Sequence, residues 1–352
     1  MELLSVTMND GVKPRSEIEG KDNSSEDKSN YKIVRKGDMV YNSMRMWQGA
    51  NGISPCDGIV SPAYTVLMPK QEINNGYFAA LFKSTNLINE FRKNSQGMTS
   101  DTWNLKYPQI ETIKVQIPSV SEQDKVSALF SVLDARIVAQ AQLVESLKKY
   151  RRGLLSQLIA QKKAFDTSGE WKTVKLGHIF KERTERAKGN ETLLAVTISN
   201  GVQRRDEIDL KDNSSDDKSN YKCVYIGDIA YNTMRMWQGA SGVSPYNGIV
   251  SPAYTIVTPI RPDLHNMTFW AYYFKYSPLV QTFQKYSQGL TSDTWNLKFP
   301  QFSEIAVTMP PISEQDKIAE CLSVFDEHCK CEDEKLQALL QVRTSLLQQL
   351  FI

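Results

Sequence analysis

The ten residues Tyr41-Asn-Ser-Met-Arg-Met-Trp-Gln-Gly-Ala50 return 190 positions later as Tyr231-Asn-Thr-Met-Arg-Met-Trp-Gln-Gly-Ala240. The likeness extends outward, because 35 of the 49 residues from Lys21 to Pro69 are identical at this offset. A repeat of this length means that the chain is an internal duplication, and each copy should fold as a similar module. Two similar modules on one chain suggest a target with two-fold character; the alternative is a recent duplication that has not yet diverged.

A second block repeats equally well. Ser95–Gln109 returns as Ser287–Gln301 with 13 of 15 residues identical, now at an offset of 192. The segment between the blocks has drifted, and only 6 of the 18 residues of Tyr77–Asn94 are kept. The two copies have therefore diverged unevenly along their length.

The composition is that of an ordinary soluble globular protein. Of the 352 residues, 41% are hydrophobic, 23% charged and 10% aromatic, which allows two or three domains with their own cores. We find no run of about 18 apolar residues, so no membrane span is expected. The five cysteines are odd in number, which favours a reduced, cytoplasmic protein. A formal charge of only +2 means that nucleic-acid binding would depend on local patches.

The pattern divides the chain into four parts: a first module over residues 1–117, a long helix over 118–165, a second module over 166–309 and a second long helix over 310–352. In the first module, short β-prone runs alternate with turn-rich stretches, and Asn75–Lys93 reads as two short helices. This indicates a mixed α/β globule. The β-prone runs are Lys32–Val34, Met39–Asn42, Tyr64–Leu67 and Ile113–Ile117.

The first long helix is predicted from a heptad-like apolar seam. Ser121 reads as its N-cap, with Asp124 three positions on, and Ser313 with Asp316 repeats this signal. The helix should run to about Gln161, roughly 60 Å at about 1.5 Å per residue, with Gly153 as a weak point. The two seams are Val126, Phe130, Leu133, Ile137, Val144, Leu147, Leu154 and Leu158, and Ile318, Leu322, Phe325, Cys329, Leu336, Leu339, Leu346 and Leu350.

Matching seams make the two helices each other's simplest partners, in an antiparallel pair. The alternative is that each helix packs only on its own module.

Enzyme signatures are weak. Ser61-Pro-Ala-Tyr64 resembles the tetrapeptide of amino-methyltransferases without its second proline, and no glycine-rich cofactor loop follows a strand. There is no phosphate loop of the Gly-Lys-Ser/Thr kind, and Glu26-Asp-Lys28 reads as a solvated loop rather than a nuclease motif. Cys321, Cys329 and Cys331 near His328 have metal-ligand character, but their counterparts are apolar, so buried seam positions are expected instead. The three histidines are unrepeated, and a duplicated active site would keep its histidine in both copies.

What repeats is a set of polar residues in turn-rich segments. Arg pairs with guanine and Asn or Gln with adenine in the major groove, while Lys, Ser and Thr serve phosphates, so this set is our candidate DNA-binding site. The alternative is that these residues are only surface turns. The candidates are Asn42, Arg45, Gln48, Ser95, Gln96, Thr99, Ser100, Thr102, Asn104 and Lys106 in the first copy, and Asn232, Arg235, Gln238, Ser287, Gln288, Thr291, Ser292, Thr294, Asn296 and Lys298 in the second.

Four tryptophans accompany this set: Trp47 and Trp103, and their counterparts Trp237 and Trp295. They could stack on bases or brace the loops, and buried bracing is the favoured interpretation.

These motifs, in this order and twice over, resemble the specificity subunit of a type I restriction–modification system across nearly the whole chain. Tyr41–Ala50 and Gly58-Ile-Val-Ser-Pro-Ala-Tyr64, then Trp103-Asn-Leu105, are similar to its target recognition domain. Ser121-Glu-Gln123, followed by a long helix ending Gly153-Leu-Leu-Ser-Gln-Leu158, is similar to its helical region, and Pro310–Gln315 through Leu350 repeats it.

The resemblance implies an α+β fold: two mixed α/β target recognition domains held apart by two long antiparallel helices, each domain reading one half of a bipartite DNA target. Because the recognition blocks are almost identical and antiparallel helices would relate them by a pseudo-two-fold axis, we expect the target to be an interrupted palindrome. The resemblance also implies a non-catalytic, cytoplasmic prokaryotic protein that directs methyltransferase subunits, two in number, and restriction/motor subunits. S-adenosylmethionine, ATP and Mg would belong to those partners, and no metal to this chain. The competing class is a coiled-coil protein-interaction scaffold with duplicated protein-binding modules.

The sequence departs from the family pattern at one place. Trp171–Gly189 looks like the usual start of a recognition domain, and it has no counterpart before Glu2. The C-terminal end of the chain could supply a substitute element.

Overall fold

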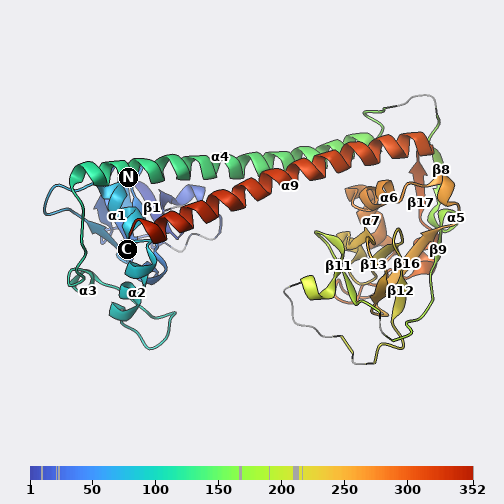
Figure 1. Cartoon of the computed structure of the whole chain (residues 1–352), viewed down its shortest axis with the longest axis horizontal. Coiled ribbons are helices and arrows are strands. Elements are labelled where there is room, and N and C mark those ends of the chain that lie inside the picture. Colours follow the sequence, from blue (N-terminus) through green and yellow to red (C-terminus); the bar gives the residue numbers. More distant parts are fainter. Residues whose placement is uncertain are drawn as a thin grey trace. The chain divides into compact units, whose positions relative to one another are not determined.

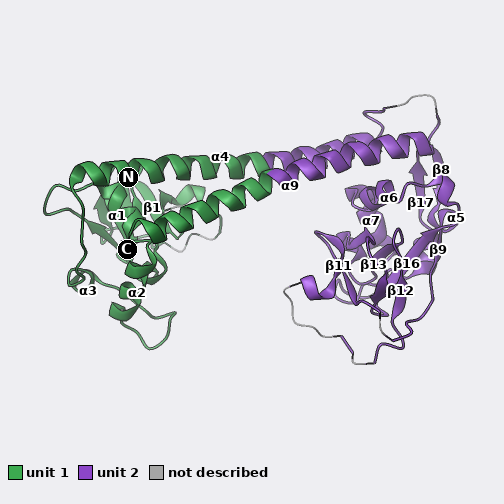
Figure 2. Cartoon of the chain, viewed as in Figure 1, with its two compact units in different colours: residues 1–144, 332–352 green, residues 145–331 purple. Residues whose placement is uncertain are grey.

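The computed structural model describes residues 1–8, 11–20, 22, 24–165, 169–189, 191–208, 214–215 and 217–351. The chain divides into two compact units (Figure 2): unit 1 holds residues 1–144 and 332–352, and unit 2 holds residues 145–331. The division falls inside both long helices, so each helix contributes one part to each unit. The four-part division drawn from the sequence follows secondary structure instead, and it stays a prediction.

Unit 1 is a mixed α/β globule (Figure 1). One sheet has the strand order β2-β1-β6-β3, with β1 parallel to β6 and the other pairs antiparallel. A second, antiparallel sheet has the order β5-β4-β7. Its elements are β1 (Glu2–Thr7), β2 (Gly11–Pro14), η1 (Arg15–Glu17), β3 (Lys32–Val34), β4 (Met39–Asn42), η2 (Met46–Gln48), β5 (Asn51–Ile53), β6 (Gly58–Val60), β7 (Tyr64–Leu67), α1 (Asn75–Leu81), α2 (Thr85–Asn94) and α3 (Tyr107–Ile110).

Most of the predicted elements of this unit are confirmed. Three β-prone runs coincide with β3, β4 and β7, and Asn75–Lys93 forms α1 and α2. Both helices are capped by side chains: Asn74 Oδ1 accepts a hydrogen bond from Tyr77 N at 3.0 Å, and Ser84 Oγ accepts one from Leu87 N at 3.4 Å. The fourth run, Ile113–Ile117, was predicted to be β-prone but is not a strand.

Unit 2 repeats this plan and adds a strand–helix–strand segment. Its largest sheet has the order β14-β13-β16-β9 and is antiparallel throughout, and β17 pairs with β8. Two further antiparallel pairs are β10-β11 and β12-β15. Its elements are β8 (Lys172–Lys175), α5 (Leu176–Ile179), β9 (Phe180–Glu182), β10 (Leu194–Thr197), β11 (Gly201–Arg204), η3 (Arg205–Glu207), β12 (Lys222–Val224), β13 (Ile229–Asn232), η4 (Met236–Gln238), β14 (Ser241–Val243), β15 (Gly248–Val250), β16 (Tyr254–Pro259), η5 (Pro262–Leu264), α6 (Met267–Tyr273), α7 (Ser277–Tyr286), α8 (Phe299–Ser303) and β17 (Ala306–Met309).

The added segment explains why the fourth β-prone run fails in unit 1. In unit 2 its counterpart becomes β17 because β8 lies beside it, with Val307 opposite Val174. An isolated extended run has no ladder of hydrogen bonds to hold it. No strand pairs with 113–117 within the described part of unit 1.

The two long helices are α4 (Val120–Ile159) and α9 (Ile312–Gln349), of 40 and 38 residues. The predicted caps are wrong. α4 begins one residue ahead of Ser121, and the hydroxyl of Ser119 accepts a hydrogen bond from Glu122 N at 3.4 Å; α9 likewise begins ahead of Ser313. Gly153 does not interrupt α4, because one glycine costs a long packed helix only about 1 kcal/mol.

The residues after the predicted caps tether each long helix to the first short helix of its unit. In unit 1, Gln123 Oε1 accepts a hydrogen bond from Asn74 N at 2.9 Å, and Asp124 Oδ1 accepts one from Asn74 Nδ2 at 2.7 Å. Gln315 and Asp316 make the same two bonds to Asn266 in unit 2. The Gln and Asp of the repeated motif therefore hold the N-cap residues of α1 and α6.

Within each unit the parts of α4 and α9 pack antiparallel. In unit 1, Gln140 meets Glu332 and Asp134 meets Arg343, so the residue number falls along one helix as it rises along the other. In unit 2, Arg151 meets Asp326 in the same sense. Both helices also pack on the globular part of each unit, through Phe130 and Leu347 in unit 1 and through Leu154, Leu158, Ile318 and Leu322 in unit 2. Each long helix therefore packs both on the other long helix and on a globular module, so both of the packing arrangements considered from the sequence occur.

The predicted seam positions are buried or half-buried, with Leu350 as an exception at 44% exposure. Cys331 was expected at a buried seam position and is exposed, because it lies two residues from buried Cys329 and therefore on another face of the helix.

Among the residues that the structure describes, α4 is long and apolar enough to cross a membrane, whereas the sequence predicted no membrane span. One such helix is weak evidence for a membrane, because helices of soluble proteins can be as long and as apolar. Asp134 on this helix is paired with Arg343.

The polar pair at the seam generates the first prediction. Gln140 Nε2 donates to Glu332 Oε2 at 2.7 Å, with both residues under 10% exposed. Replacing Gln140 with Leu leaves the buried carboxylate short of a donor and should lower the free energy of unfolding by about 1–3 kcal/mol. The double replacement Gln140→Leu with Glu332→Leu should recover most of this loss, because two apolar residues then meet. Denaturant midpoints of the three variants test this, and equal losses in the single and double variants would contradict it.

Candidate nucleic-acid interface

In each unit the two repeated blocks come together. In unit 1, Leu105 N donates to Ser43 O at 2.8 Å, and the rings of Trp47 and Trp103 meet edge to face with centroids 5.1 Å apart. In unit 2, Leu297 N donates to Thr233 O at 2.9 Å, and Trp237 meets Trp295 at 5.2 Å. We call residues 42–48 with 95–106 recognition surface 1, and residues 232–238 with 287–298 recognition surface 2.

The first part of each surface is a tight turn between a strand and a 3₁₀ helix. Asn42 Oδ1 accepts a hydrogen bond from Met44 N at 3.0 Å, and Trp47 Nε1 donates to Met44 O at 3.1 Å. The same bonds join Asn232, Trp237 and Met234 in unit 2. The tryptophans therefore brace the loops, as predicted, although they are half-buried rather than buried.

The second part is a loop closed by a backbone bridge. Gln96 and Asn104 exchange N–H···O bonds of 3.0 and 2.8 Å, and inside the loop Thr102 Oγ1 accepts from Thr99 N at 3.1 Å and donates to Thr99 O at 2.9 Å. Ser95 Oγ donates to Phe91 O at 2.6 Å. Gln288, Asn296, Thr291, Thr294 and Ser287 repeat these roles. Several predicted contact residues are thus committed to building the loop.

Other candidates keep their side chains unengaged. Within the described residues, these side chains make no hydrogen bond or ion pair to the protein, and most are exposed. They are Arg45, Gln48, Gln96, Ser100 and Lys106 in surface 1, and Arg235, Gln238, Gln288, Ser292 and Lys298 in surface 2. Each surface therefore offers a cationic pair, one arginine and one lysine, together with amide and hydroxyl groups on a braced frame.

Asn104 and Asn296 are intermediate cases. Their side-chain Oδ1 atoms are buried without a protein donor in the described structure, a costly state unless water or a ligand donates to them.

A pocket adjoins surface 1. It is lined by both repeated blocks and by β3 and β7, through Lys32, Ser43, Thr65, Asn104, Lys106 and Tyr107. Lys32 Nζ donates to Tyr64 O at 2.6 Å, which fixes one wall. Sequence reasoning missed Lys32 and Tyr107, because neither lies among the quoted recognition residues, although Lys222 and Phe299 are their counterparts.

A buried lysine supports surface 2. Lys275 Nζ donates to the carbonyls of Gly239 and Ile198, and therefore holds the end of η4. Burial, with a smaller contribution from Arg151, lowers the pKa of Lys275 to about 8. The signal was present in the sequence, because Lys83 and Lys275 match at the offset of 192 inside the segment that has otherwise drifted.

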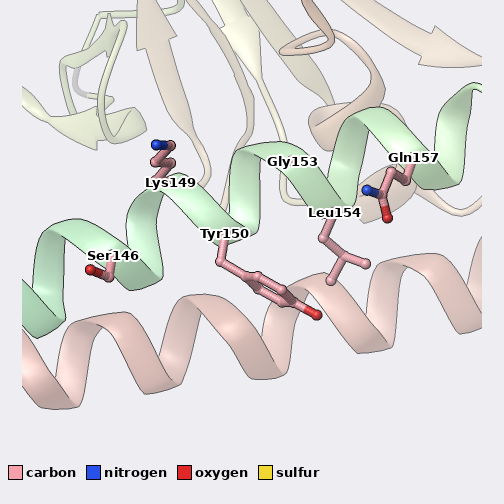
Figure 3. A pocket seen from close by; sticks show the side chains of 6 residues that line it. All are labelled: Ser146, Lys149, Tyr150, Gly153, Leu154 and Gln157. Carbon is pink, nitrogen blue, oxygen red and sulfur yellow. The ribbon is translucent and has the colours of Figure 1, made fainter.

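A second pocket, in unit 2, includes none of the candidate DNA-binding residues. It is lined by α4 alone, at Ser146, Lys149, Tyr150, Gly153, Leu154 and Gln157, with Tyr150 and Leu154 directed toward the neighbouring helix (Figure 3). No group of three or more His, Cys, Asp and Glu in the described part of the chain could hold a metal ion.

Comparison with known proteins identifies the class. The sequence matches the family described as "Type I restriction modification DNA specificity domain" over residues 5–149 and 168–341, and the chain belongs to this family. It is therefore a DNA-specificity subunit and not a catalyst, and its family implies DNA and methyltransferase or restriction subunits as partners.

Solved structures share its fold. The HsdS subunit from Thermoanaerobacter tengcongensis is 16% identical with a TM-score of 0.51, covering 91% of this chain and 81% of that chain. The type I restriction–modification S subunit from M. genitalium is 17% identical with a TM-score of 0.56, covering 91% and 84%. A chain from a structure on complex assembly and conformational transition of the type I R-M system is 16% identical with a TM-score of 0.57, covering 90% and 82%. The predicted architecture of two α/β recognition domains with two long helices and an internal repeat is thereby confirmed.

The second prediction concerns the loop of surface 1. Gly97 has φ 145°, and a Cβ there would lie 2.6 Å from Thr102 O, a backbone atom that cannot swing aside. Gly97→Ala should therefore displace the loop and weaken DNA binding by the assembled enzyme about tenfold, at a strain of roughly 1–3 kcal/mol.

Gly153→Ala is the matched control. Apart from its chain neighbours and the backbone of its own helix, no atom of the described residues lies within 4 Å of the Cβ that alanine would add. The variant should stabilise α4 by about 0.5–1 kcal/mol without changing DNA affinity. Equal DNA affinities for Gly97→Ala and the wild type would show that this loop does not contribute.

Proposed function

We propose that the chain reads a bipartite duplex DNA target, one half with each recognition surface, and directs methyltransferase and endonuclease subunits to it. The observation that carries the proposal is the repeat of unengaged polar side chains. Arg45, Gln48 and Lys106 have Arg235, Gln238 and Lys298 as counterparts on the same braced frame. These polar groups are kept in both copies, whereas only 6 of the 18 residues of the intervening segment Tyr77–Asn94 are kept, which favours a function over bare surface turns.

The chemistry assigns different tasks to these groups. The guanidinium of Arg45 suits the O6 and N7 atoms of guanine, and the amides of Gln48 and Gln96 suit the N6 and N7 edge of adenine. Lys106 and Ser100 suit phosphate oxygens, which position the protein without reading sequence. The hydrogen-bonded candidates Asn42, Ser95, Thr99 and Thr102 are positioning residues that hold the loops.

The target is an interrupted palindrome. Near-identical surfaces should read nearly the same bases, and a local two-fold relation between α4 and α9 gives the half-sites inverted order. Support comes from Gln140 and Glu332, which pair with each other and are each other's counterparts at the offset of 192. The lengths of the helices then set the spacer between half-sites, and rigid spacing combines two modest affinities into a tight one.

Differences between the copies are small. Asp57 and Asn247 both accept a backbone N–H at 2.8–2.9 Å, so this difference is structural. Cys56 and Tyr246 both pack on small cores. Met98 and Leu290 are 98% and 100% exposed on the recognition surfaces, and they leave room for one differing base.

The partners supply the chemistry. Two methyltransferase subunits with S-adenosylmethionine would modify the DNA, and restriction/motor subunits with ATP and Mg would cleave it, in the cytoplasm of a prokaryotic cell. The chain needs no cofactor or metal of its own. A protein-interaction scaffold is the second candidate, and its binding would be insensitive to added duplex, whereas DNA binding falls steeply with salt.

The third prediction separates base contacts from phosphate contacts in the assembled methyltransferase. Arg45→Ala and Arg235→Ala should each cost roughly 1–3 kcal/mol in DNA binding, with an unchanged salt slope. Lys106→Ala and Lys298→Ala should each reduce the slope of log affinity against log salt by about 1. Binding to unmodified host DNA and the rate of methyl transfer are the measurements.

Arg136→Ala, on the exposed side of α4, is the matched control and should change neither quantity. Methylation kinetics of the double variant Arg45→Ala with Arg235→Ala that match the wild type would refute the assignment of these arginines.

A further inference from the structure

The loop of each recognition surface carries an apolar side chain that nothing covers. Met98 is 98% exposed and its counterpart Leu290 is 100% exposed, more than any other large apolar side chain of the described residues. Nearly the whole of each side chain is therefore in water, where apolar surface is unfavourable. A polar residue in the same place would avoid this cost, so the position calls for a use of the apolar group.

Both copies keep the apolar character although the residue itself differs. Ser95–Gln109 and Ser287–Gln301 are identical at 13 of 15 positions, and Met98 with Leu290 is one of the two pairs that differ. Isolated exposed apolar residues are ordinary on protein surfaces. Here, however, the same kind of side chain occupies the same loop position in both copies, within their best-preserved block. What is kept is apolar volume and not one particular side chain.

The loop is closed immediately beside this position. The Cβ that alanine would add at Gly97 would lie 2.6 Å from Thr102 O, so the two backbone segments are in direct contact. Thr99 N, on the other side of Met98, donates to Thr102 Oγ1 at 3.1 Å. The loop of unit 2 repeats both features, at the same 2.6 Å and 3.1 Å. Each exposed side chain is therefore carried on a braced tip.

Duplex DNA offers little apolar surface apart from the faces of its bases. The edges of the base pairs in the grooves carry hydrogen-bond donors and acceptors, and the methyl group of thymine is the apolar exception. One methyl group covers only part of a methionine or leucine side chain. Two base faces opened at a step enclose it from both sides, which is how apolar wedges act in proteins that bend DNA.

The neighbouring polar groups fit an approach of this tip to the duplex. Ser100 and Lys106 are exposed, and they suit the phosphates beside an opened step. Asp101 and its counterpart Asp293 are also exposed at the tip. Phosphates repel a carboxylate most where they lie close together, across the narrow minor groove, whereas cytosine N4 can donate to it in the wide major groove. The tip is therefore expected to enter from the major groove.

We propose that Met98 and Leu290 are apolar wedges, each of which enters between two stacked base pairs of its half-site and bends the duplex there. The inference rests on the proposed function, because it requires one half-site for each recognition surface. The wedge adds selectivity through the deformability of a base step, and pyrimidine–purine steps open most easily. Methionine and leucine are interchangeable in this role, because the wedge needs only apolar volume.

The test uses the assembled methyltransferase and duplexes that carry its methylated motif, with the fluorescent base 2-aminopurine placed at each half-site position in turn. This base brightens when it is unstacked. The wild type should brighten a pyrimidine–purine step in each half-site. Met98→Ala should abolish the increase in one half-site and Leu290→Ala in the other. Each should weaken DNA binding about tenfold, because the burial of one large apolar side chain is lost.

Three variants serve as controls. Met98→Leu and Leu290→Met should keep both the fluorescence increase and the affinity of the wild type. Ile226→Ala should change neither, because Ile226 is 66% exposed in unit 2 but lies outside recognition surface 2. A methyltransferase also takes its target base out of the stack. Brightening from that source would persist in Met98→Ala and Leu290→Ala, which separates it from the wedge.

Three results would overturn the proposal and leave the proposed function intact. The first is a wild type that binds the motif without any brightening that depends on Met98 or Leu290. The second is an affinity that falls when a thymine is replaced by uracil, with no unstacking, which would place the side chain on a base edge. The third is a Met98→Ala subunit that no longer joins the methyltransferase subunits, which would make the tip a protein contact. A wild type that does not bind the motif would refute the proposed function itself.

Discussion

The pairing of α4 with α9 in unit 1 depends on the buried hydrogen bond between Gln140 and Glu332. An apolar seam alone tolerates slippage between two helices, whereas a buried polar pair is satisfied in one register only. Asp134–Arg343 in unit 1 and Arg151–Asp326 in unit 2 add partly exposed ion pairs in the same antiparallel sense. Such exposed pairs contribute little stability, so their value lies in alignment. The seam thus sets which residues of the two helices lie opposite each other.

This register is transmitted to the recognition surfaces through short contacts. Gln123 and Asp124 hold Asn74, the cap of α1, and the following helix α2 ends at Asn94, directly before Ser95, the first residue of the second part of recognition surface 1. Trp47 and Trp103 then join the two halves of the surface. The hydrogen bonds and ring contacts that build recognition surface 1 do not use the side chains of Arg45 and Lys106. A rigid frame with unengaged cationic and amide groups is what recognition of a polar duplex requires.

The sequence predicted much of this, for identifiable reasons. The repeat, the heptad seam and the turn-rich polar blocks are local patterns, and they led to the two modules, the helix pair and the bracing tryptophans. The predictions that were wrong concern residues whose structural partners lie far away in the sequence. Ile113–Ile117 has the composition of a strand, yet its counterpart is a strand only because β8 lies beside it. The caps were misplaced because Gln123 and Asp124 bond to Asn74, fifty residues away, rather than to their own helix. Likewise, no local sequence pattern distinguishes Asn42, whose side chain accepts a hydrogen bond within the turn, from Arg45, whose side chain makes none in the described structure.

The central claim is that two near-identical surfaces read inverted half-sites at a distance set by the helices. The most direct measurement is a map of methylated sites for the wild type and for a variant with one heptad inserted between residues 140 and 141 and another between 331 and 332. Seven residues keep the seam in register and add about 10.5 Å, or about three base pairs of B-DNA. The account predicts an interrupted palindrome for the wild type, and the same half-sites with a spacer about three base pairs longer for the variant. Two unrelated half-sites, or an unchanged spacer, would contradict it.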